Sequence, residues 1–195
     1  MWFSGRTRGP ALPADAAAAL ALADGAHVIA WSPLVGGGFA AATRERLHVL
    51  TPQGQLLARP WVEVERAAWQ ADTSALAVWW VGSPLPTPLE IVDQSRLPDA
   101  VHERVQASVV LVSEVTVPGD HTVRMALRKD VSGRVFAQVA PARGVRLDDP
   151  EVAEVLARAQ AALLEQAGQE VTRRSSELRE EHPLGFGRVR DADPA

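Results

Sequence analysis

Three consecutive glycines, Gly36 to Gly38, are the first residues of this chain whose types and spacing could do chemistry. With Ala41 they match G-x-G-x-x-A, in which a tight turn after a strand brings the backbone close to a pyrophosphate at a helix N-terminus. The flanking sequence opposes a dinucleotide site. Ser32 and Pro33 would break the strand-to-helix turn, and no strand ending in an acid follows about 20 residues later, where the ribose contact belongs. We therefore expect a bend between two strands, for which glycine supplies positive φ angles.

A predicted hairpin over residues 121–146 is the most basic part of the chain. Its charged residues are Arg124, Arg128, Lys129, Asp130, Arg134, Arg143 and Arg146. Because strand side chains alternate, Arg124 and Arg128 fall on one face and the apolar residues between them on the other. A polyanion or a phospholipid headgroup could bind this face, and a solvated face that protects the sheet from edge pairing is the alternative. The candidate ligand-binding residues are Arg124, Arg128, Lys129 and Arg134.

The other polar residues form no catalytic or metal-binding pattern. No two of the five histidines have helical i, i+3 or i+4 spacing, so we expect each to lie at the surface or half-buried. No serine lies in a G-x-S-x-G elbow, and the absence of cysteine excludes thiolate metal sites and a cysteine nucleophile. Glu63 and Glu65 alternate along one strand face, where solvation explains them better than acid–base catalysis. We expect no catalytic activity, no cofactor and no metal.

Charge and hydropathy suggest the cellular setting. The formal net charge of −4 repels nucleic acid at long range, so we expect no nucleic-acid partner. An alanine-rich run after Arg6 and Arg8 has some features of a signal peptide, but Pro10, Pro13 and Asp15 interrupt it. No window approaches the ~18 consecutive apolar residues of a membrane span. We therefore expect a cytoplasmic protein.

Short runs rich in Val, Trp and Leu, separated by Gly, Pro and Asp, fill the middle of the chain. They predict seven strands at 27–31, 38–43, 47–51, 55–59, 62–70, 75–81 and 88–93. The gaps between them are too short for helical crossovers, so the sheet should be an antiparallel meander. A short helix should follow near Ser95, with Pro98 in its first turn. Three more strands are predicted at 110–117, 121–130 and 134–141.

The chain should end in a long helix. Asp149 can cap its N-terminus, Pro150 suits its first position, and an apolar stripe predicts helix from about 150 to 167. Residues 1–13 should form a flexible arm, and residues 173–195 are polar and predicted to be disordered. Residues 14–172 should then form a single β-rich domain.

The middle of the chain resembles the bacterial pleckstrin-homology-like domains over roughly residues 26–112. The residues that carry the resemblance are Thr43, Arg46 and Leu47 in a hairpin, Pro60, Trp61 and Val64 in the following step, and Trp69 and Leu76 in the next two strands. As a whole, the chain is similar to actinobacterial proteins of that type. The resemblance implies a sheet barrel or sandwich capped by a helix, with no assigned catalytic residues. Three strands intervene before the long helix, so the second half either elaborates the barrel or forms a second lobe.

The fold class expected is therefore mainly β (α+β), an antiparallel barrel or sandwich of pleckstrin-homology-like type with a short central helix and a longer C-terminal helix. Because such folds host unrelated functions, the resemblance does not choose a ligand. We expect a non-catalytic binding or scaffolding module. It would recognise a protein segment or an anionic headgroup through a sheet edge or the 121–146 hairpin, with weak contact to a membrane surface. The alternative is a small enzyme or nucleotide-binding protein that uses the Gly36–Gly38 loop.

Overall fold

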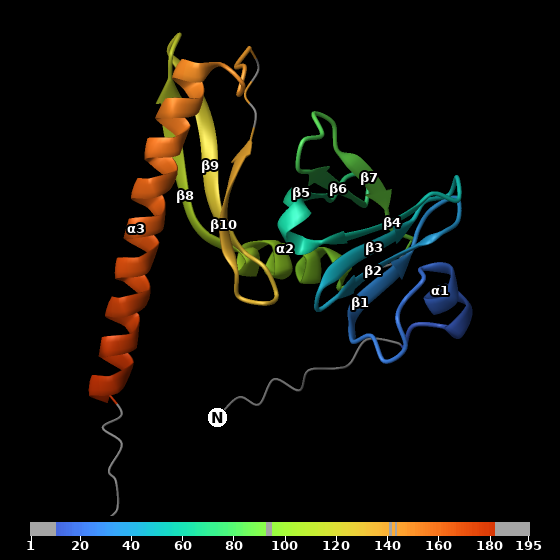
Figure 1. Cartoon of the computed structure of the whole chain (residues 1–195). Coiled ribbons are helices and arrows are strands. Elements are labelled where there is room, and N and C mark those ends of the chain that lie inside the picture. Colours follow the sequence, from blue (N-terminus) through green and yellow to red (C-terminus); the bar gives the residue numbers. More distant parts are fainter. Residues whose placement is uncertain (1–10, 93–94, 141, 143, 182–195) are drawn as a thin grey trace, which may run out of the picture.

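The computed structural model describes residues 11–92, 95–140, 142 and 144–181 of the chain, and Figure 1 shows their arrangement. Its elements are α1 (Ala14–Ala19), β1 (Val28–Pro33), β2 (Phe39–Thr43), β3 (Arg46–Leu50), β4 (Leu56–Pro60), the 3-10 turn η1 (Trp61–Glu63), β5 (Val64–Gln70), β6 (Ala75–Trp80), β7 (Thr87–Glu90), α2 (Leu97–Ser108), β8 (Val109–Val117), β9 (His121–Lys129), β10 (Val135–Ala140) and α3 (Pro150–Glu181). The ten predicted strands and the two predicted helices after residue 90 are all present.

The first seven strands form two antiparallel sheets. One has the order β1-β2-β3-β4 and the other the order β5-β6-β7. Strands that are consecutive in the chain are therefore neighbours in the sheet. The turn η1 connects the two sheets, and the indole Nε1 of Trp61 donates a hydrogen bond to the Thr43 carbonyl at 3.1 Å. The antiparallel, sequential order of the strands is as predicted, but the seven strands form two sheets and not one. We call residues 14–108 the first lobe.

The core of the first lobe lies between its two sheets and α2. Alternate strand residues such as Leu47, Val49, Val78 and Trp80 are buried there. Helix α2 begins directly after the β7 region and buries Leu97, Val101 and Val105, which are spaced four residues apart and so lie on one stripe. This helix contacts β1, β2 and β5, and it closes the core on the side that the sheets leave open.

The outer face of the four-stranded sheet is covered by α1. Two residues of this short helical segment, Ala16 and Leu20, are fully buried, and so is Ala41 of β2. His48 of β3 is only 8% exposed and makes a hydrogen bond with the Leu20 backbone. The prediction that every histidine lies at the surface or half-buried is therefore wrong for His48, because an alanine-rich helix docks on its strand.

Residues 109–181 form a C-terminal lobe with its own core. Its sheet has the order β10-β9-β8, and α3 lies along it (Figure 1). The core consists of apolar residues from both layers, among them Val123, Met125, Leu127, Val152 and Leu156. The buried apolar residues of the described chain therefore form two clusters. The second half forms a separate lobe and does not extend the sheets of the first.

Helix α3 begins as predicted and ends later than predicted. The Asp149 carboxylate accepts a hydrogen bond from the Glu151 amide at 2.9 Å, as expected of a cap. The helix then continues to Glu181, well past residue 167 and into the segment expected to be a polar tail. The sequence after Gly168 is rich in Glu and Arg and holds no proline before Pro183, which favours a helix. Most of the predicted N-terminal arm, residues 1–10, and the rest of the tail, residues 182–195, lie outside the described residues.

The observed fold is mainly β, with three antiparallel sheets and a few helices, as the sequence predicted. None of the helices in the described part of the chain is long and apolar enough to cross a bilayer.

Candidate functional site

The glycine loop joins two antiparallel strands. β1 pairs with β2 in a hairpin, and Gly36, Gly37 and Gly38 between them all have positive φ angles. A Cβ at Gly38 would also collide with the Leu50 carbonyl oxygen, so this residue lets β2 start close to the end of β3. The predicted bend between strands is confirmed. Since β2 and not a helix follows the loop, the loop lacks the helix N-terminus that holds the phosphates in the dinucleotide motif.

The hairpin leaves β1 at the edge of its sheet. β1 pairs with β2 on one side only. On the other side, Leu34 just after β1 forms an isolated antiparallel bridge with Ile91 just after β7, and the Val35 amide donates to the Glu90 carbonyl at 2.9 Å. Further back, the Ser95 hydroxyl donates to the Trp31 carbonyl at 2.8 Å, a position where a neighbouring strand would place an N–H. A side chain therefore replaces the missing strand at this point.

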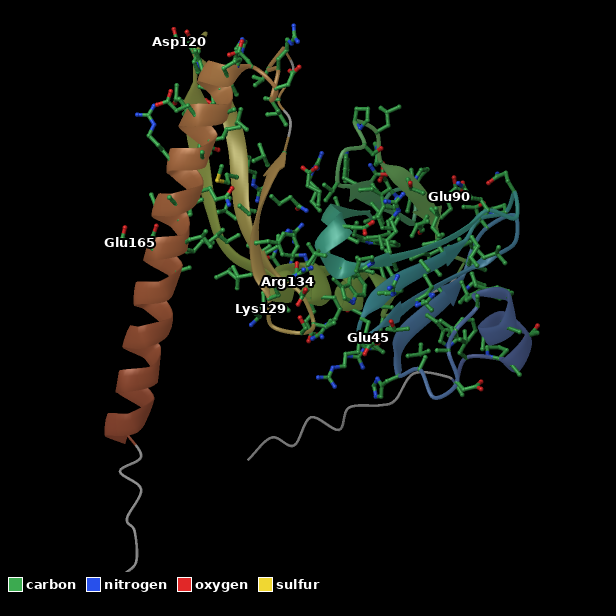
Figure 2. All side chains as sticks on the ribbon, viewed as in Figure 1. Glu45, Glu90, Asp120, Lys129, Arg134 and Glu165 are labelled. Atoms are coloured by element: carbon green, nitrogen blue, oxygen red, sulfur yellow. The ribbon has the colours of Figure 1, made fainter. Side chains whose placement is uncertain are left out.

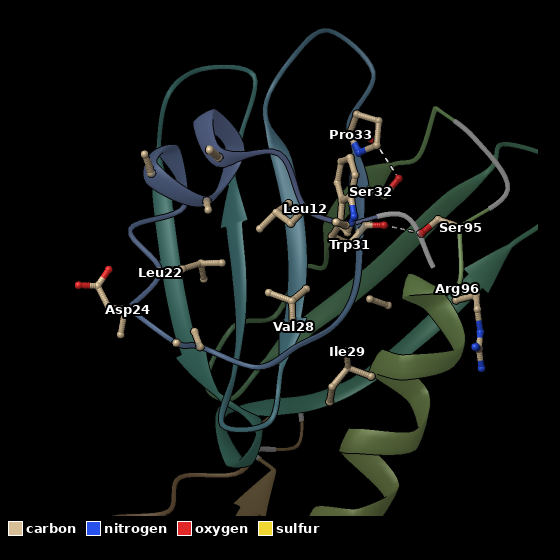
Figure 3. A pocket seen from close by; sticks show the side chains of 18 residues that line it. Leu12, Leu22, Asp24, Val28, Ile29, Trp31, Ser32, Pro33, Ser95 and Arg96 are labelled. Atoms are coloured by element: carbon tan, nitrogen blue, oxygen red, sulfur yellow. Dashed lines mark hydrogen bonds between the residues drawn. The ribbon is translucent and has the colours of Figure 1, made fainter. Parts of the chain in front are cut away.

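A groove of about 820 Å³ runs along this edge (Figure 3). Every residue from Val28 to Pro33 lines it. Because alternate residues of a strand point to opposite faces, this continuous lining means that the groove follows the edge of the strand and does not cover one face. The opposite walls come from α1, from the loop before β1 and from Ser95 and Arg96. We call it the β1 groove.

The β1 groove is mainly apolar. Leu12, Leu22 and Val28 surround its centre in Figure 3, and the α1 wall consists of alanines. Ile29, at a β-bulge, is 40% exposed beside it. Asp24 and Arg96 are the only charged residues among the described lining. With a volume inside the ~300–1,000 Å³ range of ligand pockets, the groove can hold an extended apolar chain.

The basic hairpin does not form one ligand-binding face. Arg124, Lys129 and Arg134 are exposed, but Arg128 is only 2% exposed. Its guanidinium donates to backbone carbonyls of the first lobe, including the Val64 and Glu65 carbonyls. Arg128 therefore lies against the first lobe and not toward solvent. This corrects its assignment as a ligand-binding residue: alternation predicted its face correctly, but the first lobe covers that face.

The exposed basic residues are dispersed, and some are paired. Figure 2 shows Lys129 and Arg134 near the β9–β10 turn. Arg134 forms an ion pair with Asp130 at 3.2 Å, and hydrogen bonds from Ser132 and the Arg134 backbone lower the pKa of the Asp130 carboxyl. Arg146 pairs with Asp148 at 3.0 Å. Arg143 lies outside the described residues.

Comparisons with known proteins leave the family open. No protein-family model matches the chain, and the searches of curated proteins and of solved structures give no match. The argument for function therefore depends on the geometry of this chain.

Two features of the site region were not found from the sequence. The β1 groove depends on α1 and Ser95 lying beside β1, and Ser95 is 64 residues from its partner Trp31. His48 is buried under α1, and its Nδ1 atom has no hydrogen-bond partner among the described residues. Burial lowers the pKa of this imidazole, and Arg46 lowers it further, while the Leu20 backbone and Glu45 act in the opposite direction. The alternation of β3 predicts which face of the sheet carries His48. That face is shielded from solvent only because α1 packs on it. No group of His, Asp and Glu in the described part of the chain is arranged to hold a metal ion.

Proposed function

We propose that the protein is a non-catalytic binding module that holds an extended, apolar protein segment in the β1 groove. One observation carries the proposal: a largely apolar groove follows β1, which among the described strands forms a ladder with β2 alone. Edge strands bind extended peptides by adding a strand, and neighbouring pockets then select alternate side chains. In the β1 groove, one set of partner side chains would lie over Leu12, Leu22 and Val28, and the alternate set would face Ser95.

The partner segment should be short. The bulge between Val28 and Ala30 interrupts the ladder at one end of the edge. Pro33 has no N–H, and the Val92 amide already donates to its carbonyl at 3.4 Å. These features shorten the open edge, which limits pairing with long strands of other molecules. Affinity would then come mainly from the apolar side chains of the partner.

We further propose that the first lobe is a pleckstrin-homology-like domain. Two antiparallel sheets with a helix packed against the core between them support this proposal. The residues of the resemblance also interact with one another. The Arg46 amide donates to the Thr43 hydroxyl at 3.0 Å, and the Trp61 indole donates to the Thr43 carbonyl. Because α2 occupies the capping position after the seventh strand, the three later strands and α3 are an addition to such a domain.

An anionic headgroup is a weaker candidate for the ligand. Arg128 is buried and Arg134 is paired with Asp130, so Arg124 and Lys129 would have to supply most of the attraction. Exposed single charges contribute little in physiological salt.

Filling the groove tests the proposal. Ala18 and Ala19 are both exposed on α1, but only Ala18 lines the groove. Short random peptides displayed on phage would be selected on the wild-type protein, and their affinities measured on Ala18→Trp and Ala19→Trp. We expect enriched peptides with alternating apolar residues, at least a tenfold loss of affinity in Ala18→Trp, and wild-type binding in Ala19→Trp.

Two results would count against the β1 groove: no enrichment on the wild type, or equal binding by both variants. Co-sedimentation with phosphatidylserine vesicles, compared between wild type and Arg124→Glu, tests the headgroup candidate. Binding that is lost in Arg124→Glu would replace the proposed ligand with a membrane surface.

A further inference from the structure

The two lobes have separate hydrophobic cores, and polar side chains make hydrogen bonds from one lobe to the other. The apolar residues divide into two clusters, one on each side of the contact. Between them, Arg128 and Gln138 extend from the C-terminal sheet to the first lobe. The Gln138 side-chain Nε2 donates to the Val62 carbonyl at 2.9 Å, and its Oε1 accepts from the Arg128 Nε at 3.2 Å. Gln138 therefore contacts the first lobe and also orients Arg128.

The Arg128 guanidinium enters a ready-made set of acceptors on the first lobe. One terminal nitrogen, Nη1, donates to the Ser108 hydroxyl at 2.6 Å and to the Val105 carbonyl at 3.4 Å, both in the last turn of α2. The other, Nη2, donates to the Val64 carbonyl at 2.5 Å and to the Glu65 carbonyl at 3.1 Å at the start of β5. Two different elements of the first lobe, α2 and β5, thus supply two acceptors for each terminal nitrogen of the guanidinium.

These acceptors suit a guanidinium better than a compact cation. The Val105 carbonyl lies at the C-terminal end of α2, where partial negative charge collects, and it also accepts a hydrogen bond from the Ser108 hydroxyl at 2.6 Å. The two carbonyl acceptors on β5 belong to an edge strand of its sheet. Among the described residues, no carboxylate forms an ion pair with Arg128, so neutral oxygens solvate the charge. Burial lowers the Arg128 pKa and nearby Arg124 lowers it further, while Glu65 opposes both. A planar group with five donors in fixed directions can satisfy all these acceptors at once, whereas an ammonium cannot.

We propose that the start of β5 and the end of α2 form a guanidinium-binding pocket, that Arg128 is its ligand within the chain, and that the C-terminal lobe detaches from the first lobe when the pocket is vacated. The polar contact makes detachment possible because each lobe keeps its own apolar core. A partner arginine presented on a strand would have the chemistry to compete for the same pocket. This inference does not depend on the β1 groove.

The distance between the lobes is the direct measurement. Because the chain contains no cysteine, Asp72→Cys and Gln160→Cys place one spin label on an exposed position of each lobe. We expect a narrow distance distribution in the otherwise wild-type protein and a broad one in Arg128→Ala. Arg124→Ala, the matched change at an exposed arginine on the same strand, should keep the narrow distribution. Tryptophan fluorescence and helical circular dichroism check that both lobes stay folded, since all six tryptophans precede residue 81 and α3 is the longest helix.

Chemical rescue tests the pocket itself. Methylguanidinium added to Arg128→Ala should narrow the distribution with a saturating concentration dependence, and methylammonium at the same ionic strength should not. A narrow distribution in Arg128→Ala, or a broad one that methylguanidinium leaves unchanged, would overturn the proposal. If Arg128→Ala does not fold, Arg128→Lys provides the test. We expect a broad distance distribution with both lobes folded. A narrow distribution would show that any cation suffices and would contradict a guanidinium-specific pocket.

Discussion

His48 shows how one buried side chain can connect pH to the fold. It lies on β3 under α1, with its Nδ1 unpartnered in the described structure. Protonation would add a buried donor without an acceptor, which agrees with a pKa lowered by burial. The carboxylate of Glu45 and the Leu20 carbonyl favour the charged form, but Arg46 opposes it.

We expect the free energy of unfolding to decrease as the pH falls below about 6.5, the usual pKa of histidine. Above this pH the imidazole is neutral in both states and contributes no pH dependence. Below it, the unfolded chain binds a proton that the folded chain does not, so stability is lost until the pH reaches the lowered pKa of the folded state. Urea denaturation of wild type and His48→Gln at pH 7.5 and 5.5 checks this. The decrease should be smaller in His48→Gln and unchanged in His102→Gln, which replaces an exposed histidine; equal decreases in all three would mean that His48 is not the group responsible.

At the scale of single elements, the N-terminus of α3 allows a clean test. The Asp149 carboxylate accepts a hydrogen bond from the Glu151 amide, one of the amides that a helix leaves without a partner. We expect Asp149→Ala to destabilise the C-terminal lobe by about 1 kcal/mol. Asp148→Ala removes the neighbouring carboxylate, which forms only an exposed ion pair with Arg146, and should cost much less. Thermal denaturation followed by helical circular dichroism measures both, and equal losses would show that Asp149 is no cap.

The sequence predicted the elements well because their signals are local. Alternating apolar residues indicated the strands, and three consecutive glycines, which have positive φ angles in the structure, indicated the bend before β2. The end of α3 was missed because the polarity of its last turns was taken for disorder, although helix propensity depends on side-chain type and not on burial.

What the sequence did not predict depends on which elements dock on one another. Alternation placed Arg124 and Arg128 on the same face of β9, yet one is exposed and the other buried, because the end of α2 and the start of β5 cover only Arg128. The β1 groove exists for the same kind of reason: α1 packs beside β1, and Ser95 comes to β1 from a distant part of the chain. At the scale of the whole molecule, the alternation of residues predicts which face of a sheet each side chain occupies. Tertiary contacts determine which of these faces are covered and which can bind a partner.

The two cores predict that the lobes respond separately to mutation. Leu47 and Leu127 are both fully buried, the first in the core of the first lobe and the second in that of the C-terminal lobe. Replacing either by alanine should cost about 2–5 kcal/mol in its own lobe. Because five of the six tryptophans lie in the first lobe and none in the C-terminal lobe, fluorescence follows mainly the first lobe, whereas helical circular dichroism is dominated by α3. Leu127→Ala should therefore lower the urea midpoint seen by circular dichroism more than the midpoint seen by fluorescence, and Leu47→Ala should do the reverse. Coincident midpoints in both variants would instead show a single cooperative unit, in which the polar contact through Arg128 couples the lobes as firmly as a shared core.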